Sequence, residues 1–412
     1  MTVDEVDLLS PDALADPYPL YRRMREHTPV FWDERLKGWV VTRYEDVHAA
    51  STDPARYSSD RRVEKLISSR VPPEFAEEVD PLVRMTTQWV SMSDPPVQTR
   101  LRRHLQRAFN PRTVAALEPY ITEVVRELLD AVRADVREHG RADLMARFAH
   151  PLPALIMADL FGFPRADAEL LKRWWDALKV FFGGSPDPAG GFGAAMAGLD
   201  EMVKYFTAVV AEKRARPDDG FVSHLVAVDQ DGGFLGDEEL YANLVFVLGA
   251  SYSTTMDLIG NGVHGLLTQH DQWRRLVDRP ELAAKAVEEV LRFDGPVQVT
   301  QRVTTRGVEL RGTRIAADES VFLVRGSANR DPARFPEPDR LDLDREPSGH
   351  VAFGVGAHYC VGAVLARMVG RIAFTELVRG VPDLRLDPST PARWRADTLQ
   401  FRGLGSLPVV GS

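Results

Sequence analysis

The sequence predicts a mainly α-helical protein with a smaller β part, and three observations support this fold class. Apolar residues recur at helical spacing from about Thr113 to Asp135. A long, largely apolar segment lies between residues 237 and 269. After about residue 300, short β-like runs alternate with loops. Further helices are expected near residues 166–182 and 191–215, with a glycine- and proline-rich break at Gly183–Pro188 between them.

The segment 237–269 is predicted to form one long buried helix. Asp237 is a suitable N-cap, and acidic residues follow it in the first turn, where the helix dipole favours negative charge. Residues 244–250 are apolar on every side, so this part should be buried all round. Ser251–Thr255 interrupts the apolar run. Because buried hydroxyl groups are costly without partners or a ligand, this stretch is a candidate site.

The β part is predicted from short runs near both ends of the chain. A strand is expected at Gly38–Thr42, followed by a helix from about Tyr44. Other β-like runs are Gly307–Arg314, Ser320–Leu323 and 397–409. No stretch has the composition of a linker, so residues 1–412 are expected to form a single domain.

Composition and charge argue against several classes of protein. The formal net charge of −9 argues against nucleic-acid binding, which needs a basic face. The one cysteine excludes an intrachain disulfide and fits a reducing cytosol. Met1–Tyr21 lacks the basic and apolar regions of a signal peptide. No run reaches the roughly 18 apolar residues of a membrane span, so a cytoplasmic protein is expected.

The segment Phe353–Gly362, FGVGAHYCVG, carries the strongest chemical signal. Two glycines at alternate positions allow a tight turn and a close approach to a flat ligand. Cys360 precedes an apolar helical segment, and a helix N-terminus or a metal stabilises a thiolate. A lone cysteine in such a loop is, by itself, more often a buried free thiol. A zinc site on His358 and Cys360 has little support, because no second pair of Cys or His lies nearby.

This segment resembles the haem-binding signature of the cytochrome P450 superfamily, Phe-Gly-x-Gly-x-His-x-Cys-x-Gly, at every fixed position. The resemblance covers nearly the whole chain. It implies the cytochrome P450 fold, a triangular helical prism around a buried haem b, with Cys360 as the axial thiolate ligand of the iron. It also implies that Phe353 and Gly354 lie on the sulfur side and that His358 reaches a haem propionate.

Further haem contacts follow from the same resemblance. Arg102 and Arg302 match propionate-binding arginines of the family, and a guanidinium can bind a carboxylate bidentately. Gln98 stands where the family usually has histidine, and it is a weaker, neutral substitute.

A structural pair is predicted on the helix that follows Asp278. Glu289 and Arg292 lie three residues apart and match the Glu-x-x-Arg pair of the family. The resemblance implies a triad with an arginine of the following loop, which is either Arg334 or Arg340.

The predicted oxygen side departs from the family. The pattern Ala/Gly-Gly-x-Asp/Glu-Thr-Thr corresponds to Ala250–Thr255, with Ala250 expected beside the haem. Thr254 matches the alcohol that orders water. Ser251 replaces the glycine, and Ser253 replaces the acid that helps to deliver protons.

Three interpretations of Ser253 remain open. In the first, Ser253 relays protons through water and the reaction is ordinary monooxygenation. In the second, the substrate brings its own polar group. In the third, the chemistry avoids that protonation, as in aryl coupling, ring closure or nitration, because a serine cannot supply protons as a carboxylic acid does. Asp257, one turn further on, is a partial substitute, although that region faces away from oxygen in the family.

Substrate contacts are predicted from position in the family fold alone. They are Trp89, Val90, Phe246, Val297, Gln298, Leu399 and Gln400. Trp174, Trp175, Phe181 and Phe182 lie in the lid region, where an aromatic stripe is more often core. These residues suggest an aromatic or fused-ring substrate of secondary metabolism with a few polar groups.

The resemblance also implies reaction partners. A monooxygenase of this type uses O2 and two electrons from a ferredoxin or flavodoxin with its reductase, and we expect a monomer without nucleic-acid or membrane partners. Arg103, Arg107 and Arg112 are expected on the docking face, at the cysteine side of the haem. Two other functions stay open: a haem-thiolate enzyme that does not hydroxylate, and a non-enzymatic haem sensor or carrier.

Overall fold

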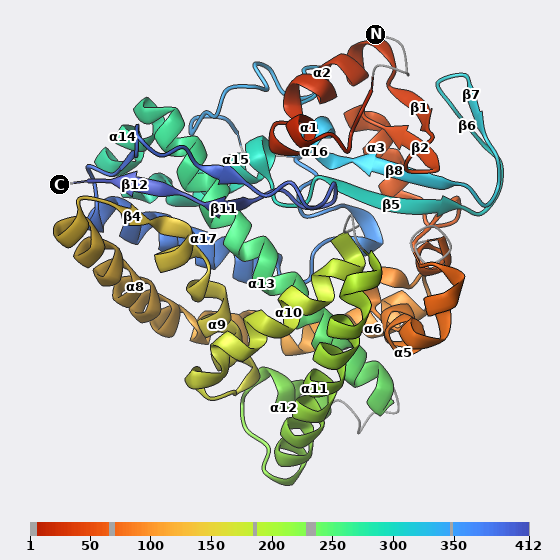
Figure 1. Cartoon of the computed structure of the whole chain (residues 1–412), viewed down its shortest axis with the longest axis horizontal. Helices are drawn as coiled ribbons and strands as arrows, with labels where there is room; N and C mark the ends of the chain where they lie inside the picture. Colours follow the sequence, from red (N-terminus) through yellow and green to blue (C-terminus); the bar gives the residue numbers. More distant parts are fainter. Residues whose placement is uncertain (1–5, 66–70, 184–187, 228–235, 347–348, 412) are drawn as a thin grey trace.

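The computed structural model describes residues 6–65, 71–183, 188–227, 236–346 and 349–411. Helices make up most of this part of the chain, as predicted (Figure 1). They are α1 (Pro11–Ala15), α2 (Tyr18–His27), α3 (Tyr44–Thr52), α5 (Ala76–Thr87), α6 (Val97–Ala108), α7 (Pro111–Ala116), α8 (Glu118–His139), α9 (Pro151–Phe161), α10 (Ala168–Gly183), α11 (Pro188–Ala215), α12 (Phe221–Ala227), α13 (Asp237–Thr268), α14 (His270–Asp278), α15 (Ala283–Asp294), α16 (Arg325–Ala328) and α17 (Ala363–Gly380).

The long helix α13 runs through the middle of the molecule (Figure 1). It contacts α9, α10, α11, α15 and α17, which explains its apolar sequence. Its N-cap is Gly236, one residue before the predicted Asp237, and Asp237 instead pairs with Arg214 in the first turn. The hydroxyl-bearing stretch does not break the helix. Ser253 and Thr254 each donate a hydrogen bond to the carbonyl four residues earlier.

The predicted helix from Thr113 to Asp135 is two helices in the structure. α7 ends at Ala116 and α8 begins at Glu118. Pro119 explains the new start, because proline lacks the backbone N–H that a continuing helix needs and is tolerated in a first turn. The glycine- and proline-rich break falls between α10 and α11, and its residues 184–187 lie outside the described part of the chain.

The main sheet joins strands from the N-terminal part of the chain to strands between residues 299 and 324. Its strand order is β1-β2-β8-β5-β3, with β2 and β8 parallel and the other neighbours antiparallel. The strands are β1 (Val30–Asp33), β2 (Gly38–Val41), β3 (Tyr57–Ser58), β5 (Val299–Thr304) and β8 (Ser320–Val324). The predicted strand at Gly38 and the run from Ser320 are therefore confirmed, and β5 is an element that the sequence patterns did not single out.

Smaller sheets complete the β part. β6 (Val308–Leu310) and β7 (Thr313–Ile315) form a hairpin that covers most of the predicted run Gly307–Arg314 and ends one residue beyond it. Two C-terminal strands, β11 (Leu404–Ser406) and β12 (Pro408–Val410), pair with β10 (Arg393–Trp394), β4 (Ala142–Asp143) and β9 (Arg385–Leu386). The main sheet lies beside the N-terminal helices, whereas β4 and β12 lie on the other side of the view, near α14 and α17 (Figure 1).

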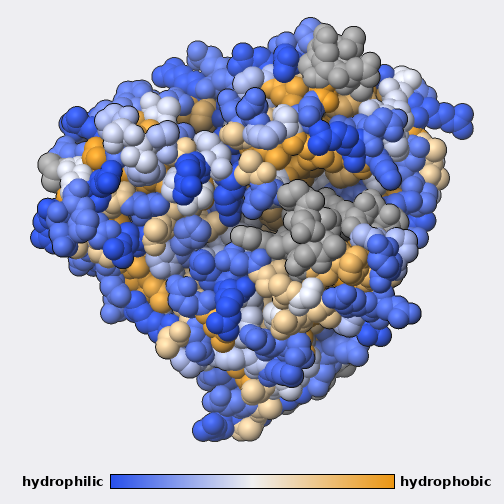
Figure 2. All heavy atoms as spheres, in the orientation of Figure 1, coloured by the Kyte–Doolittle hydropathy of each residue, from blue (hydrophilic) through white to orange (hydrophobic). Residues whose placement is uncertain are grey.

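On the face shown in Figure 2, hydrophilic residues predominate and hydrophobic residues form scattered patches. Within the described ranges, none of the helices combines the length and the apolar character that crossing a membrane requires.

Candidate active site

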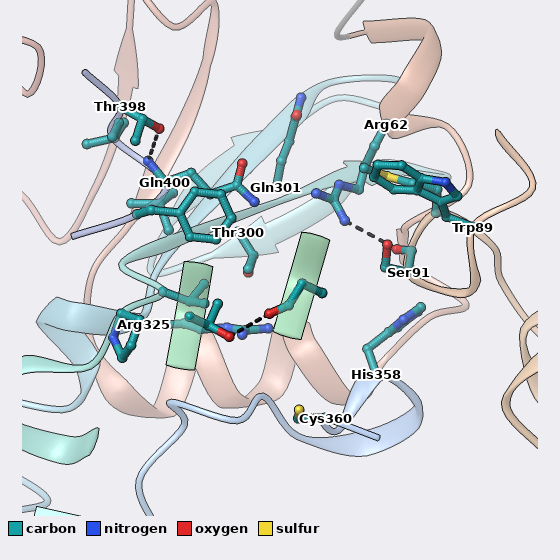
Figure 3. Close-up of a pocket in the computed structure, with 18 of the residues that line it drawn as sticks. Arg62, Trp89, Ser91, Thr300, Gln301, Arg325, His358, Cys360, Thr398 and Gln400 are labelled. Atoms are coloured by element: carbon teal, nitrogen blue, oxygen red, sulfur yellow. Dashed lines mark hydrogen bonds between the residues drawn. The ribbon is translucent and has the colours of Figure 1, made fainter. Parts of the chain in front are cut away.

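The loop before α17 presents the sulfur of Cys360 to the interior (Figure 3). Gly354 and Gly356 have φ angles of +71° and +69°, a left-handed conformation that glycine adopts most readily. A Cβ at Gly354 would lie 3.1 Å from a guanidinium nitrogen of Arg325. The Cys360 N–H donates to the Phe353 carbonyl at 2.8 Å and closes the loop. The two glycines therefore allow the tight turn that the sequence predicts.

The surroundings of the Cys360 thiol act on its pKa in opposite directions. Burial raises the pKa of the thiol above its ordinary value, and a hydrogen bond from the Gly362 N–H and the charges of nearby arginines offset only part of this rise. The arginines are Arg102, Arg325 and Arg367. A thiolate here would thus find donors and positive charge already in place.

A cavity of about 1030 Å³ lies above Cys360, and α13 forms its opposite wall. Most of the predicted site residues border this cavity. They are Trp89, Val90, Gln98, Arg102, Phe246, Ala250, Ser251, Thr254, Val297, Arg302, Phe353, His358, Cys360, Leu399 and Gln400. The fold thus places residues that are far apart in the sequence around the same cavity.

Three predicted residues do not border the cavity: Ser253, Gln298 and Gly354. On α13 the bordering residues recur three or four apart, so the Ser253 side chain points elsewhere. Val297 and Val299 border the cavity, and successive side chains of an extended chain point to opposite sides. The Gln298 side chain between them therefore points away from the cavity. Its amide nitrogen donates to the Gly295 carbonyl at 2.8 Å and to the Tyr18 hydroxyl at 3.2 Å. The structure thus does not place Gln298 in contact with a substrate in this cavity.

The oxygen side of the cavity offers hydroxyl groups. Thr254 Oγ1 donates to the Ala250 carbonyl at 2.6 Å, and Ser251 and Thr255 also border the cavity. Asp257 is fully buried, and both of its carboxylate oxygens accept hydrogen bonds from Arg395, at 2.6 and 2.8 Å. Asp257 is not among the bordering residues, so the structure does not support the partial substitution considered for it.

A donor-rich wall lies beside the loop. The Gln98 amide donates to the Ala357 carbonyl at 2.6 Å, and Arg102 donates to the carbonyls of Ala357 and Tyr359. Arg302 is 3% exposed. His358 Nε2 is buried without a hydrogen-bond partner among the described residues. An unpaired buried nitrogen next to guanidinium groups suits an anionic ligand.

Apart from the exposed Arg35, which pairs with Asp7, two cavity arginines were missed by sequence reasoning, namely Arg62 and Arg325. Burial lowers the pKa of each to about 9, and each also feels the positive charge of Arg302. Neither lies in a motif, so no local signal marked them. Trp175 and Phe192 were also not assigned to the site, and they border the cavity. Phe181 and Phe182 have side chains outside the described part.

The site fits the haem that the sequence resemblance implies. The cavity has a sulfur at its base, a mostly apolar lining and an edge rich in cationic donors. The porphyrin of haem b is a flat apolar ring with two carboxylates at one edge. Its ring matches the apolar lining, and its carboxylates match the cationic edge. Cys360 would hold the iron, and the donor-rich wall would hold the carboxylates.

The structural pair is confirmed, but the predicted third member is wrong. Glu289 and Arg292 form two hydrogen bonds of 2.7 Å in the core. Arg345 is the second arginine on Glu289, at 3.1 Å. Arg340 contributes only its backbone carbonyl to Arg292, and Arg334 lies against the rings of Tyr44 and Phe335. The chain follows an irregular path between residues 329 and 346, so spacing in the sequence alone did not show which of its arginines contacts Glu289.

Comparison with known proteins identifies the family. The family model for cytochrome P450 matches residues 261–380. The chain is 38% identical to cytochrome P450 monooxygenase PikC of Streptomyces venezuelae, over 98% of this chain and 93% of that protein. It is also 38% identical to vitamin D(3) 25-hydroxylase of Pseudonocardia autotrophica, over 99% of this chain and 96% of that protein.

Solved structures show the same fold. The crystal structure of P450BioI in complex with an acyl carrier protein ligated to hexadec-9Z-enoic acid superposes with a TM-score of 0.87 at 30% identity. The match covers 98% of this chain and 99% of that one. With near-complete coverage by relatives above 30% identity, this chain belongs to the cytochrome P450 family of haem-thiolate oxidoreductases.

Proposed function

We propose that this monooxygenase holds haem b through Cys360 and oxidises a largely apolar, ring-containing secondary metabolite in the cavity above it. The observation that carries the proposal is the sulfur of Cys360 at the base of a cavity whose opposite wall is formed by Ala250, Ser251 and Thr254. Haem bound there would supply the oxygen activation that the family uses. The protein supplies binding, orientation and protons.

The assigned residues divide into three roles. The Gly362 N–H bonds the sulfur, and Phe353 packs on that side of the site. Gln98, Arg102, Arg302 and His358 form the polar edge. On the opposite wall, the hydroxyl of Thr254 borders the cavity and holds or passes a proton at Oγ1.

Substrate chemistry is proposed from the cavity wall. Trp89 packs against Phe246 with ring centroids 5.3 Å apart, and Val90, Val297 and Leu399 add apolar surface. Gln400 is a polar group in that wall. A flat or fused-ring substrate with a few polar groups suits such a wall. The name of the related vitamin D(3) 25-hydroxylase supports a large apolar ring substrate.

A second function is favoured by one observation, the replacement of the acid by Ser253. Its side chain is buried outside the cavity and bonds the Gly249 carbonyl, so it supplies no acid to the oxygen side. Aryl coupling, ring closure or nitration would not need that proton.

The electron donor is proposed to be a ferredoxin or flavodoxin with its reductase, acting on a monomer. Arg103, Arg107 and Arg112 are exposed, on or next to the helix that also binds the Cys360 loop through Arg102. An acidic partner would meet complementary charge there.

Two measurements test the function. The reduced, carbon monoxide-bound protein should show the absorption band of a thiolate-ligated haem, and Cys360→Ser should abolish it. Persistence of the band in the variant would contradict the ligand assignment. Turnover with isotopically labelled O2 then separates the two functions: a labelled product supports monooxygenation, and an oxidised product without label supports the non-hydroxylating reaction.

A further inference from the structure

Positive charge gathers at one edge of the cavity. Arg62 precedes the segment 66–70, Arg302 lies on β5 and Arg325 begins α16. All three border the cavity, and Figure 3 shows Arg62 and Arg325 around the space above Cys360 and His358. Arg302 and Arg325 are only 3% and 8% exposed. Charges buried to this degree require partners.

The protein provides few acceptors for these groups. Arg62 Nη1 donates to the Ser91 carbonyl at 3.3 Å, and Arg302 Nη1 donates to the Gln301 carbonyl at 2.7 Å. Within the described chain, the Nε atoms of Arg62 and Arg325 have no acceptor. Each guanidinium therefore keeps donors for a ligand.

The charges are also not balanced by the protein. The carboxylate that acts on Arg62 and Arg302 is Asp94. It is held by the Ser58 hydroxyl at 2.5 Å and by the Ser59 N–H at 2.9 Å. Asp94 thus offsets at most one of these charges, and the negative group that acts on Arg325 is the Cys360 sulfur. With Arg102 also at this edge, positive charge is in excess, and the two carboxylates of a haem would neutralise part of it.

Gln98 explains why additional cations are needed at this edge. The amide nitrogen of Gln98 already donates to the Ala357 carbonyl at 2.6 Å, and the side chain carries no charge. In the family pattern a histidine at this position adds a donor that can be positive.

We propose that Arg62 and Arg325 bind the carboxylates of the haem and replace the cation that Gln98 does not supply. This inference rests on the proposed haem site. It also links the cofactor to the substrate wall, because Arg62 is bonded to Ser91, which lies next to Val90. Haem binding would thereby fix the segment that carries Trp89 and Val90.

The test uses Arg62→Met, Arg325→Met and the double variant of the haem-loaded protein. Arg61→Met is the matched control, because Arg61 pairs with Asp318 at 3.0 Å and does not border the cavity. The first readout is the rate of haem loss to excess apomyoglobin. Loss of a hydrogen bond to a charged group should speed this loss about tenfold for each single variant and more for the double variant, while Arg61→Met stays at the wild-type rate.

Two further readouts identify the ligand group. Removing positive charge beside the haem should shift its reduction potential to more negative values, and the propionate bending bands of the resonance Raman spectrum should move. Hexadecanoic acid and its methyl ester serve as probes in spectral titrations. Arg62→Met should change their affinities by the same factor, because the arginine serves the haem.

The outcomes are distinguishable. Wild-type haem loss, potential and Raman bands in both single variants would overturn the inference. A selective loss of affinity for the free acid would overturn it too, because the arginines would then bind a substrate carboxylate. If Arg325→Met does not fold by circular dichroism, Arg325→Lys and Arg62→Met decide. A wild-type protein without the thiolate-ligated band would contradict the proposed function itself, whereas unchanged variants of a protein that shows the band would contradict only this inference.

Discussion

At the scale of single residues, the two sides of the cavity differ in how closely they follow the family. The Cys360 side has the expected loop, with a closing hydrogen bond of 2.8 Å from Cys360 to Phe353. On the oxygen side, Thr254 borders the cavity, whereas Ser253 is buried away from it. We therefore expect proton supply to depend on Thr254 more than on Ser253, the residue that replaces the acid.

Thr254→Ala should lower the product formed per electron pair by up to about 10²-fold and raise the release of hydrogen peroxide, because a positioned proton donor is lost. Ser253→Ala should change both quantities little, since Ser253 Oγ bonds the Gly249 carbonyl outside the cavity. Product yield and peroxide are measured against the electron donor consumed. Equal losses in the two variants would show that Ser253 takes part in the relay.

Glu288 should make stability depend on pH. Burial raises the pKa of this carboxyl, but hydrogen bonds from His350 and Arg367 outweigh it and lower the pKa to about 2. A lowered pKa stabilises the fold above the unfolded value of about 4.3, and this stability disappears as the pH falls towards 2. The contribution is about 3 kcal/mol at most.

The measurement for Glu288 compares wild type with Glu288→Gln in denaturant unfolding. The variant should be less stable at pH 7, and the difference should shrink between pH 4 and pH 2. A difference that stays constant over this range would mean that the charge of Glu288 is not the source of its contribution.

At the scale of elements, contiguous patterns could be predicted and long-range partners could not. The helix α13 and the Cys360 loop are each formed by one continuous stretch of sequence. The apolar pattern was therefore sufficient to predict the helix, and motif spacing was sufficient to predict the loop. Arg62, Arg325 and Arg345 lie in no pattern, and their roles arise only when distant segments meet. The direction in which the Gln298 side chain points depends on the extended backbone before β5, and no sequence pattern had predicted that backbone.

The loop between residues 329 and 346 should depend on Arg345 for its attachment to α15. Arg345 bonds Glu289 at 3.1 Å and the Pro336 carbonyl at 2.7 Å. Arg345→Met should lower the free energy of unfolding by about 2 kcal/mol. Arg340→Met is the matched control and should cost less than about 0.5 kcal/mol, because that side chain is 51% exposed. Equal effects in urea unfolding would contradict the assignment of Arg345.

The packing of α10 on α13 should depend on the absence of a side chain at Gly249. A Cβ there would overlap the ring of Trp175, which also borders the cavity. Gly249→Ala should destabilise the protein by about 1–3 kcal/mol and alter ligand-induced spectral shifts. Gly193→Ala on α11 should instead be neutral or stabilising by up to about 1 kcal/mol, since its nearest neighbour lies at 3.9 Å. A neutral Gly249→Ala in thermal unfolding would contradict this packing.

At the scale of the whole molecule, the face around the Cys360 loop differs from the rest of the surface. The chain as a whole carries a net charge of −9, yet α6, which binds this loop through Arg102, and the neighbouring α7 carry the exposed Arg103, Arg107 and Arg112. Among the described residues, the large hydrophobic side chains that are exposed are Val97, Tyr359 and Val364. All three lie on α6, on the Cys360 loop or at the start of α17. Exposed apolar groups on elements that also carry exposed charged residues are typical of a protein-binding surface.

Charge reversal at Arg103, Arg107 and Arg112 should therefore slow electron transfer from an acidic ferredoxin. The arginines steer the encounter from a distance, so the triple Arg→Glu variant should reduce the second-order rate of haem reduction by about tenfold or more at low ionic strength. The difference from wild type should shrink as salt screens the charges. Arg23→Glu on α2, also exposed, is the control and should leave the rate unchanged. Stopped-flow reduction at several salt concentrations measures both effects. A triple variant with the wild-type rate and salt dependence would place the docking surface elsewhere on the molecule.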